Sequence, residues 1–243
     1  MKTVAIVQAR MGSTRLPGKV LKDIGGRTML ARVIERTSRS KLIDRIVVAT
    51  TTESVDEPVV AESTNLKVPI FRGSQEDVLD RYYRAAEEQD ADPIVRITSD
   101  CPLVDPEVID QVLALYRREM PDYASNVITR TFPLGLDVEV LSRDALARAW
   151  RLATKPFERA HVTPFIYQRP DRFRLAALRA DQDYSKYRWT VDTPEDLEFV
   201  RAVYACLGVD GHFGWREILS LVEREPTLAA INRGVRQKAL EEG

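Results

Sequence analysis

The sequence has few of the features that mark secreted or membrane proteins. It holds two cysteines in 243 residues, Cys101 and Cys206, which lie far apart and form no CxxC pair. Neither a disulfide framework nor a cysteine zinc site is therefore expected. The apolar run at residues 4–7 is too short for a signal-peptide core, and no stretch approaches membrane-spanning length. We expect a cytoplasmic protein with no membrane partner.

The chain also lacks an excess of charge of either sign. Its 36 lysines and arginines face 37 aspartates and glutamates, a net charge of −1, so no global basic field points to a nucleic-acid partner. With 44% hydrophobic residues, intrinsic disorder is excluded. Internal repeats, low-complexity tracts and linkers are absent from the sequence. We therefore predict a single domain over residues 1–243.

Short apolar strands alternate with amphipathic helices in the first half of the chain, which predicts an α/β fold with a mainly parallel sheet covered on both faces. After about residue 120 the pattern changes, and we predict an inserted subregion near residues 130–180. The predicted strands are 4–7, 44–50, 68–71, 93–98, 136–141, 173–178 and 188–191. Three helices are predicted to begin near Thr28, Ser74 and Pro106. A fourth follows the strand at 136–141 and continues through Trp150, and a fifth runs from Pro194 to Leu207.

A glycine-broken cationic loop, "QARMGSTRLPGK", follows the first predicted strand. It is not a P-loop, because its glycine spacing is one residue too long and Val20 replaces the hydroxyl that would bind magnesium; GxGxxG is also absent. Gly12 allows close backbone approach, and Arg10, Arg15 and Lys19 supply positive charge suited to a triphosphate. An ordinary strand-to-helix connection fits the same residues.

Two aspartates stand at the ends of predicted strands. Asp100 lies in "TSDCPL", and Asp192 opens "DTPE". Each alone is typical of a turn or a helix start. Ligands of parallel sheets bind beyond the carboxyl ends of the strands, where the cationic loop also lies. Two carboxylates and a cationic loop at that edge fit a site for Mg²⁺ and a triphosphate.

These segments carry a family resemblance. "IVQARMGSTRLPGKVL" and "DRIVVATT" resemble the start of the nucleotide-sugar cytidylyltransferases, the group that includes the KDO and acylneuraminate enzymes. "FRGSQEDVLDRY", "RITSDCPLVDP", "FPLGLDVEV", "AHVTPFIY" and "WTVDTPEDL" are closer to the spore-coat polysaccharide (SpsF-type) branch. The resemblance spans roughly residues 3–205. It implies a Rossmann-like nucleotidyltransferase fold and transfer of CMP from CTP to a sugar acid or related acidic acceptor, with release of pyrophosphate.

The resemblance also implies roles for individual residues. Asp100 and Asp192 would hold Mg²⁺, and with Arg10 and Lys19 they would form the catalytic set. In-line nucleotidyl transfer needs positioning and charge neutralisation more than covalent catalysis, which agrees with these residue types. The implied nucleotide-binding residues are Ala9, Arg10, Gly12, Ser13, Arg15 and Lys19 around the triphosphate, and Arg72, Gly73, Thr98 and Ser99 beside the cytidine.

The acceptor pocket is placed in the later part of the chain, at Gly135, Asp137, Glu139 and His161. A histidine there can orient or deprotonate a hydroxyl, although a lone histidine is often structural. Arg96, Arg130 and Arg159 either meet an anionic acceptor or form ion pairs. Because related enzymes form two-fold dimers through this region, which also holds Phe132, Trp150 and Phe157, we expect a homodimer.

Three other functions remain open from sequence. A glycosyltransferase also uses a nucleotide-binding α/β sheet, but it would want a DxD-like pair of acids where residues 99–101 offer one. A cytidylyltransferase for a phosphonate or phosphorylated acid differs only in its acceptor. A nucleotide-sensing module without turnover would have less need of Lys19, Asp100 and Asp192 together.

Overall fold

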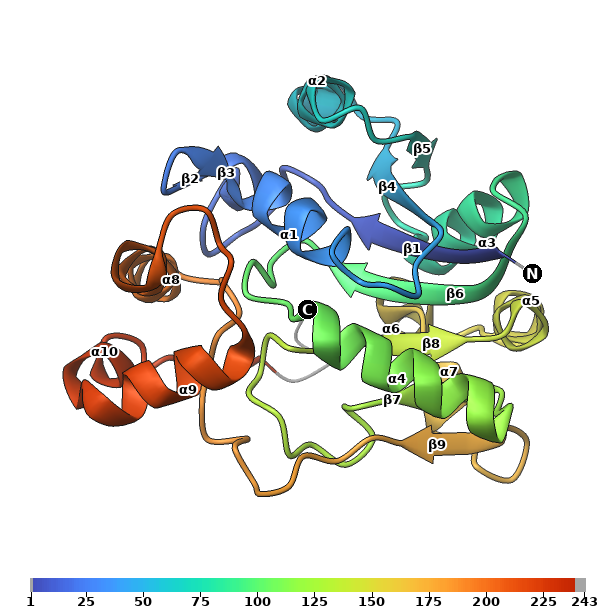
Figure 1. Cartoon of the computed structure of the whole chain (residues 1–243). Coiled ribbons are helices and arrows are strands. Elements are labelled where there is room, and N and C mark those ends of the chain that lie inside the picture. The colour runs from blue at the N-terminus through green and yellow to red at the C-terminus, as the bar shows by residue number, and fades with distance from the viewer. Residues whose placement is uncertain (1, 239–243) are drawn as a thin grey trace.

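The computed structural model describes residues 2–238 and is built on one seven-stranded sheet (Figure 1). All neighbouring strands pair in parallel except at β8, which is antiparallel to both β6 and β7. Since β8 alone runs against the others, the prediction of a mainly parallel sheet is confirmed. In spatial order the strands are β5 (Ile70–Gly73), β4 (Arg45–Thr51), β1 (Lys2–Gln8), β6 (Ala91–Thr98), β8 (Glu139–Leu141), β7 (Tyr123–Ser125) and β9 (Leu175–Ala177).

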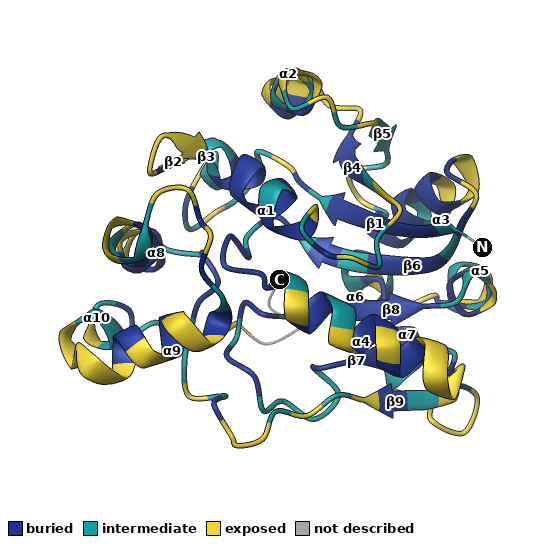
Figure 2. Cartoon of the chain, in the orientation of Figure 1, coloured by how far each residue is buried: buried dark blue, intermediate teal, exposed yellow. Residues whose placement is uncertain are grey.

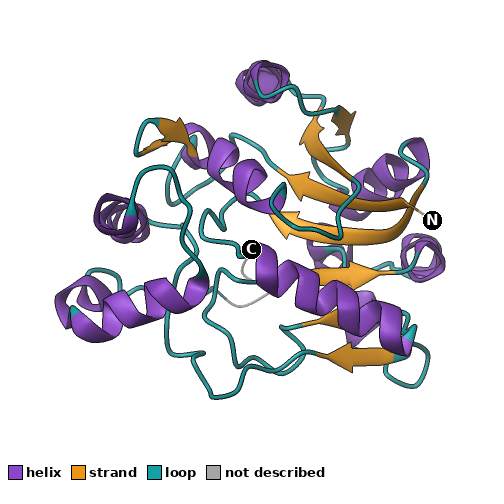
Figure 3. Cartoon of the chain, in the orientation of Figure 1, coloured by secondary structure: helices purple, strands orange, loops and turns teal. Residues whose placement is uncertain are grey.

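Helices cover both faces of the sheet (Figure 3). A small separate ladder, β2 (Asp23–Ile24) with β3 (Arg27–Thr28), follows the cationic loop. The helices are α1 (Met29–Thr37), α2 (Glu57–Asn65), α3 (Val78–Glu88), α4 (Pro106–Glu119), α5 (Arg143–Leu152), α6 (Pro156–His161), α7 (Pro164–Tyr167), α8 (Pro194–Leu207), α9 (Trp215–Arg224) and α10 (Pro226–Ala230). Within residues 2–238, none of the helices has the length and apolar character needed to cross a membrane.

The apolar run of β1 is continuous because the strand is buried on both faces (Figure 2). Its side chains alternate between the two cores, as the two-residue strand period requires. Ala5 and Val7 join the cluster beneath α1 and α4, whereas Val4 and Ile6 join the one beneath α3 and α5. This double burial holds the carboxyl end of β1, and thus the cationic loop, in a fixed place.

Helix starts follow the capping residues that the sequence displays. Thr28 accepts a hydrogen bond from the Ala31 amide at the start of α1, as predicted. The helix predicted near Ser74 instead begins at Val78. The Ser74 hydroxyl accepts from the Asp77 amide, and the Asp77 carboxylate caps the helix by accepting from the Asp80 amide. The Ser74–Asp77 spacing therefore forms a turn before the helix.

The strand predicted at 188–191 is wrong. The segment makes only an isolated bridge, between Leu134 and Arg188. Its backbone amides donate to carbonyls in loops and not to a neighbouring strand. The Trp189 amide donates to the Leu134 carbonyl at 2.6 Å, and the Val191 amide donates to the Asp100 carbonyl at 2.8 Å. Gly135 permits this approach, because at its φ of 107° a Cβ would lie 2.5 Å from the Thr190 nitrogen. The loop thus ties Asp192 to the turn that holds Asp100.

Residues 130–180 contribute β8 and β9 to the main sheet, and α5, α6 and α7 pack on one of its faces. The strands predicted over 136–141 and 173–178 are observed in shorter form. After α8, the described residues 208–238 contain α9 and α10, in which sequence analysis finds no motif. They are anchored by Arg36, a buried side chain of α1 that donates to the Gly211 and Phe213 carbonyls at 3.0 Å.

Candidate active site

The site lies beyond the carboxyl ends of β1 and β6, which point toward α8 and α9 (Figure 1). The Ser99 amide donates to the Gln8 carbonyl at 3.2 Å, which joins the turn after β6 to the end of β1. Val191, bonded to the Asp100 carbonyl, brings the segment before α8 to the same place. Three segments that are remote in sequence therefore meet at one edge of the sheet, where the parallel pattern predicts a ligand.

Lys19 lies between the two predicted metal ligands. Its Nζ donates to Asp100 Oδ2 at 3.1 Å, to Asp192 Oδ1 at 2.9 Å and to the Val191 carbonyl at 2.8 Å. Its side chain is 12% exposed. Burial by itself would lower the pKa of Lys19, but the two carboxylates raise it above its ordinary value. Lys19 is thus a charged, fully bonded ammonium.

The same ion pair acts on Asp100 in the opposite sense. Burial would raise the pKa of Asp100, but the Lys19 ammonium keeps it below its ordinary value, so the carboxyl is ionised. Asp192 receives two more cations on its other oxygen. Arg15 Nη2 lies 2.9 Å and Arg188 Nη2 2.8 Å from Asp192 Oδ2. The site therefore contains two carboxylates that share one ammonium.

These carboxylates fit a magnesium ion. One oxygen of each lies within 3.1 Å of the same point, the Lys19 Nζ, so both face a common centre. Among residues 2–238, there is no group of three or more His, Cys, Asp or Glu that could hold a metal. Two carboxylates suffice for Mg²⁺, which usually takes its remaining ligands from phosphates and water. A cation at that centre would compete with the Lys19 ammonium for the carboxylate oxygens.

The cationic loop is supported by Asp56, a residue that the sequence analysis did not single out. The buried Asp56 accepts from the Met11 amide at 2.6 Å and from the Thr51 hydroxyl. Farther along, Gly18 adopts a left-handed conformation with φ of 64°, which turns the chain so that Lys19 faces inward. Arg10 and Gly12 are exposed, and a Cβ on Gly12 would meet nothing within 4 Å. This stretch therefore presents its backbone to incoming ligands.

The residues predicted to border cytidine lie along the same sheet edge. Thr98 ends β6 and Ser99 follows it, whereas Arg72 and Gly73 end β5, with β4 and β1 between the two strands. The Arg72 guanidinium donates to the Thr51 carbonyl at 3.0 Å and to Glu57 at 2.7 Å. It is therefore fixed over the end of β4, on the side of the loop away from Asp192.

The predicted acceptor residues separate into a surface pair and a buried network. Asp137 forms a bidentate ion pair with Arg130, at 2.6 and 2.7 Å. Glu139 is buried, pairs with Arg96, and accepts from the Tyr123 and Thr163 hydroxyls at 2.5 and 2.6 Å. Burial and Glu139 raise the pKa of Tyr123 well above its ordinary value, so its hydroxyl remains a donor.

His161 ends α6 beside an unusual turn. Val162 has φ of 72° and ψ of −56°, and the Thr163 amide donates to the His161 carbonyl at 2.8 Å. This is a classic γ-turn, which is strained for a β-branched residue. Through Thr163 the turn joins the Glu139 network. Arg159, the third arginine considered for an anionic acceptor, pairs with Asp77 at 2.5 Å, so all three such arginines are in ion pairs.

Arg188 was not predicted to belong to the site. Its guanidinium bonds both Asp192 and the buried Asp196, which in turn accepts from the Asp192 amide at 2.9 Å. In sequence, only the four-residue spacing between Arg188 and Asp192 hints at this contact. Arg188 and Asp196 together orient the Asp192 carboxylate.

Comparisons with known proteins show which family this chain resembles. Residues 4–214 match a family model described as cytidylyltransferase. The spore coat polysaccharide biosynthesis protein SpsF of Bacillus subtilis is 34% identical over 92% of this chain and 95% of its own. The 3-deoxy-manno-octulosonate cytidylyltransferase of Brucella ovis is 38% identical, with 86% of each chain covered. A solved cytidylyltransferase from Leptospira borgpetersenii superposes with a TM-score of 0.90 at 32% identity, covering 98% of this chain and 100% of its own.

Proposed function

The chain belongs to the cytidylyltransferase family, and we propose that it transfers CMP from CTP to a sugar acid or related acidic acceptor with release of pyrophosphate. The relatives named for SpsF and for 3-deoxy-manno-octulosonate cytidylyltransferase support an acidic acceptor in polysaccharide biosynthesis. An acceptor oxygen attacks the α-phosphorus of CTP while the bond from that phosphorus to the bridging oxygen breaks. The observation that most supports this reaction is Lys19 held between Asp100 and Asp192 at the carboxyl edge of the sheet.

In this proposal, Asp100 and Asp192 hold magnesium, which when bound neutralises charge on the phosphates. The chain's own cations do the rest. Lys19 has three N–H donors, and those now bound to carboxylates would turn to the phosphate oxygens. Arg10, Ser13 and Arg15 line the path of the triphosphate from the loop after β1. Because bond breaking increases charge on the leaving pyrophosphate, the Lys19 interaction strengthens in the transition state.

On the acceptor side, the proposal uses Gly135, Asp137, Glu139 and His161. Asp137 and Glu139 are already paired with Arg130 and Arg96. An acidic acceptor would therefore compete with these carboxylates for the arginines, a direct way to recognise an anion. His161, next to the strained Val162, would orient the acceptor hydroxyl.

A screen for pyrophosphate release tests the reaction. The purified chain is incubated with each of four nucleoside triphosphates, with Mg²⁺ or EDTA, against a panel of acidic sugars, phosphonates and phosphorylated acids. We expect release with CTP, with magnesium and with an acidic sugar. Release only with a phosphonate or phosphorylated acid would change the acceptor class. Sugar transfer from a nucleotide sugar, or tight CTP binding without release on any acceptor, would contradict the proposal.

We further propose a homodimer of two-fold symmetry. Of the three aromatic residues that suggested it, Phe132 is buried within the chain against Trp215, and Trp150 stacks on Tyr83 at 4.2 Å. The support for the dimer is therefore the family resemblance of this region rather than its exposed aromatic surface. Light scattering at micromolar concentration is expected to give twice the 27.6 kDa of one chain, and a mass of one chain would contradict the dimer.

A further inference from the structure

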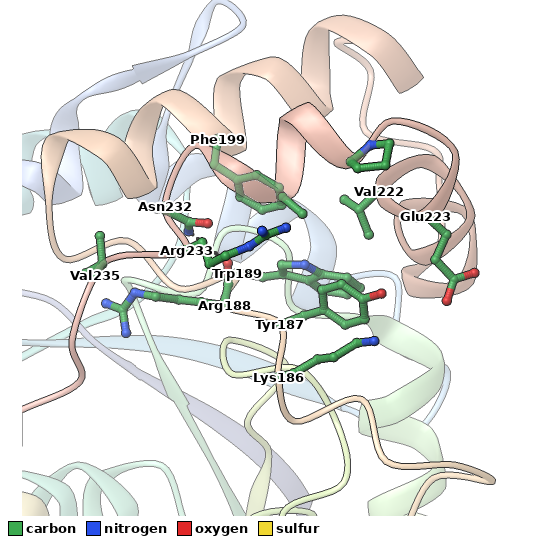
Figure 4. A pocket seen from close by; sticks show the side chains of 12 residues that line it. Lys186, Tyr187, Arg188, Trp189, Phe199, Val222, Glu223, Asn232, Arg233 and Val235 are labelled. Atoms are coloured by element: carbon green, nitrogen blue, oxygen red, sulfur yellow. Dashed lines mark hydrogen bonds between the residues drawn. The ribbon is translucent and has the colours of Figure 1, made fainter.

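A cavity of about 580 Å³ lies beside Arg188, between residues 186–189 and the last helices (Figure 4). Its volume is within the range of sites that hold small organic molecules. The predicted nucleotide and acceptor residues line no part of it. It remains open because the Asn232 amide bonds the Arg188 carbonyl and Asp196, both at 2.9 Å, which holds residues 231–235 above the space.

The walls of this cavity combine flat apolar surfaces with unmatched positive charge. Tyr187 presents a partly exposed ring, and Trp189 and Phe199 of α8 lie behind the cavity surface, each 1% exposed. Lys186 and Arg233 add two cations at the rim, and in Figure 4 the Arg233 side chain extends toward the Phe199 and Trp189 rings. Across the described part of the chain, neither cation has an ion-pair partner; the Lys186 ammonium lies 5.0 Å from the Tyr187 ring centroid.

We propose that this cavity is a second small-molecule site, which binds an organic anion with a flat apolar body, and that its occupant strengthens nucleotide binding. An apolar ligand alone would leave both cations unpaired, and an inorganic anion would leave the Tyr187 ring and the aliphatic lining at Pro226 and Ala229 uncovered. A compound with both parts pairs with the cations and covers this apolar lining. Glu223, the one acidic residue of the lining, repels an anion less than Lys186 and Arg233 together attract it.

Arg188 connects this site to the nucleotide site. Its stem lines the cavity, while its Nη2 bonds Asp192 and its Nη1 bonds the Gln237 side chain at 2.5 Å. An anion in the cavity competes with Asp192 for this guanidinium. Asp192 Oδ2 then keeps Arg15 as its one cation instead of two. Because less positive charge competes for this carboxylate, CTP with magnesium would bind more tightly. This coupling depends on the proposed CTP site, whereas binding in the cavity does not.

Phenyl phosphate is a suitable probe, because it joins an aromatic ring to a dianion. Calorimetric titration of the full chain without nucleotide or magnesium is expected to show one binding event. Arg233→Ala combined with Lys186→Ala should weaken it about tenfold, since charge-assisted hydrogen bonds are lost. Ala229→Phe, which narrows the cavity without changing charge, should also weaken it. Arg224→Ala removes a cation from the same helical region outside the lining and should change affinity less than about twofold.

Arg15→Ala separates the two anion sites. Loss of probe binding in Arg15→Ala, with normal binding in the cavity variants, would place the probe in the triphosphate loop and overturn the site. Saturating probe is expected to tighten CTP binding about threefold in the native chain and to leave it unchanged in Arg233→Ala. Probe binding with no effect on CTP affinity would overturn the coupling. Melting curves confirm that each variant is folded.

Discussion

Asp192→Asn is expected to lower turnover by about a hundredfold or more, with the fold intact. Asparagine keeps the shape of the side chain and one acceptor oxygen, but it removes the charge that three cations share. Lys19, Arg15 and Arg188 all lie within 2.9 Å of this carboxylate. Without it, magnesium loses one of its two predicted ligands. Asp100→Asn removes the other and should act alike.

The measurement is pyrophosphate release over a range of magnesium concentrations, with circular dichroism to follow folding. Asp183→Asn is the matched control, since Asp183 is an exposed loop carboxylate that caps only the Ser185 amide. If the loss is a metal effect, excess magnesium should partly restore the Asn variants. Near-normal activity of Asp192→Asn at ordinary magnesium would remove this residue from the site.

Local sequence signals predict the part of the fold that supports the nucleotide loops. Strands β1 and β4 contain continuous apolar runs because both of their faces are buried, and such runs are visible in sequence. In β6 the apolar run is shorter, because Arg96 interrupts it. The starts of α4 and α8 follow from proline after a capping residue. With these elements placed, the loops that carry Lys19 and Asp100 had to share an edge.

The parts of the site that could not be predicted from sequence depend on contacts between segments that are remote along the chain. Asp56 supports the cationic loop from 45 positions away, through a single hydrogen bond to the Met11 amide. The segment at 188–191 has the residues of a strand, but its amides bond loops near Leu134 and Asp100. Only that arrangement turns Arg188 onto Asp192. The cavity beside Arg188 likewise requires α9 and α10, whose sequences resemble no motif.

The charge state of the Lys19 cluster sets the pH range of the site. The pKa of Lys19 is raised in the folded protein. Its contribution to stability is therefore complete at pH values below the ordinary lysine pKa, and it is lost as the pH rises through the raised pKa. The pKa of Asp100 is lowered in the folded protein. Its contribution to stability is therefore present at pH values above the ordinary aspartate pKa, and it is lost as the pH falls through the lowered pKa. The ion pair therefore stays charged across roughly pH 4 to 10.

Lys19→Ala is accordingly expected to lower kcat by about a hundredfold or more while changing CTP affinity much less. In the free protein the ammonium already has three acceptors, so moving to the triphosphate exchanges bonds rather than adding them. Its net gain comes as charge builds on the leaving pyrophosphate, where a compact cation on a flexible stem can follow. Lys19→Met, which keeps most of the stem, should show the same loss.

Arg15→Ala should behave differently, weakening CTP binding about tenfold with kcat nearly unchanged, because a planar guanidinium holds a phosphate in the ground state. Lys22→Ala, a nearby cation that no predicted role includes, is the control for net charge. Steady-state kinetics and calorimetric CTP titration on the three variants separate the two effects. Normal turnover of Lys19→Ala at saturating CTP would contradict the transition-state role of Lys19. If neither Lys19→Ala nor Arg15→Ala changes rate or affinity, the loop after β1 does not bind the triphosphate.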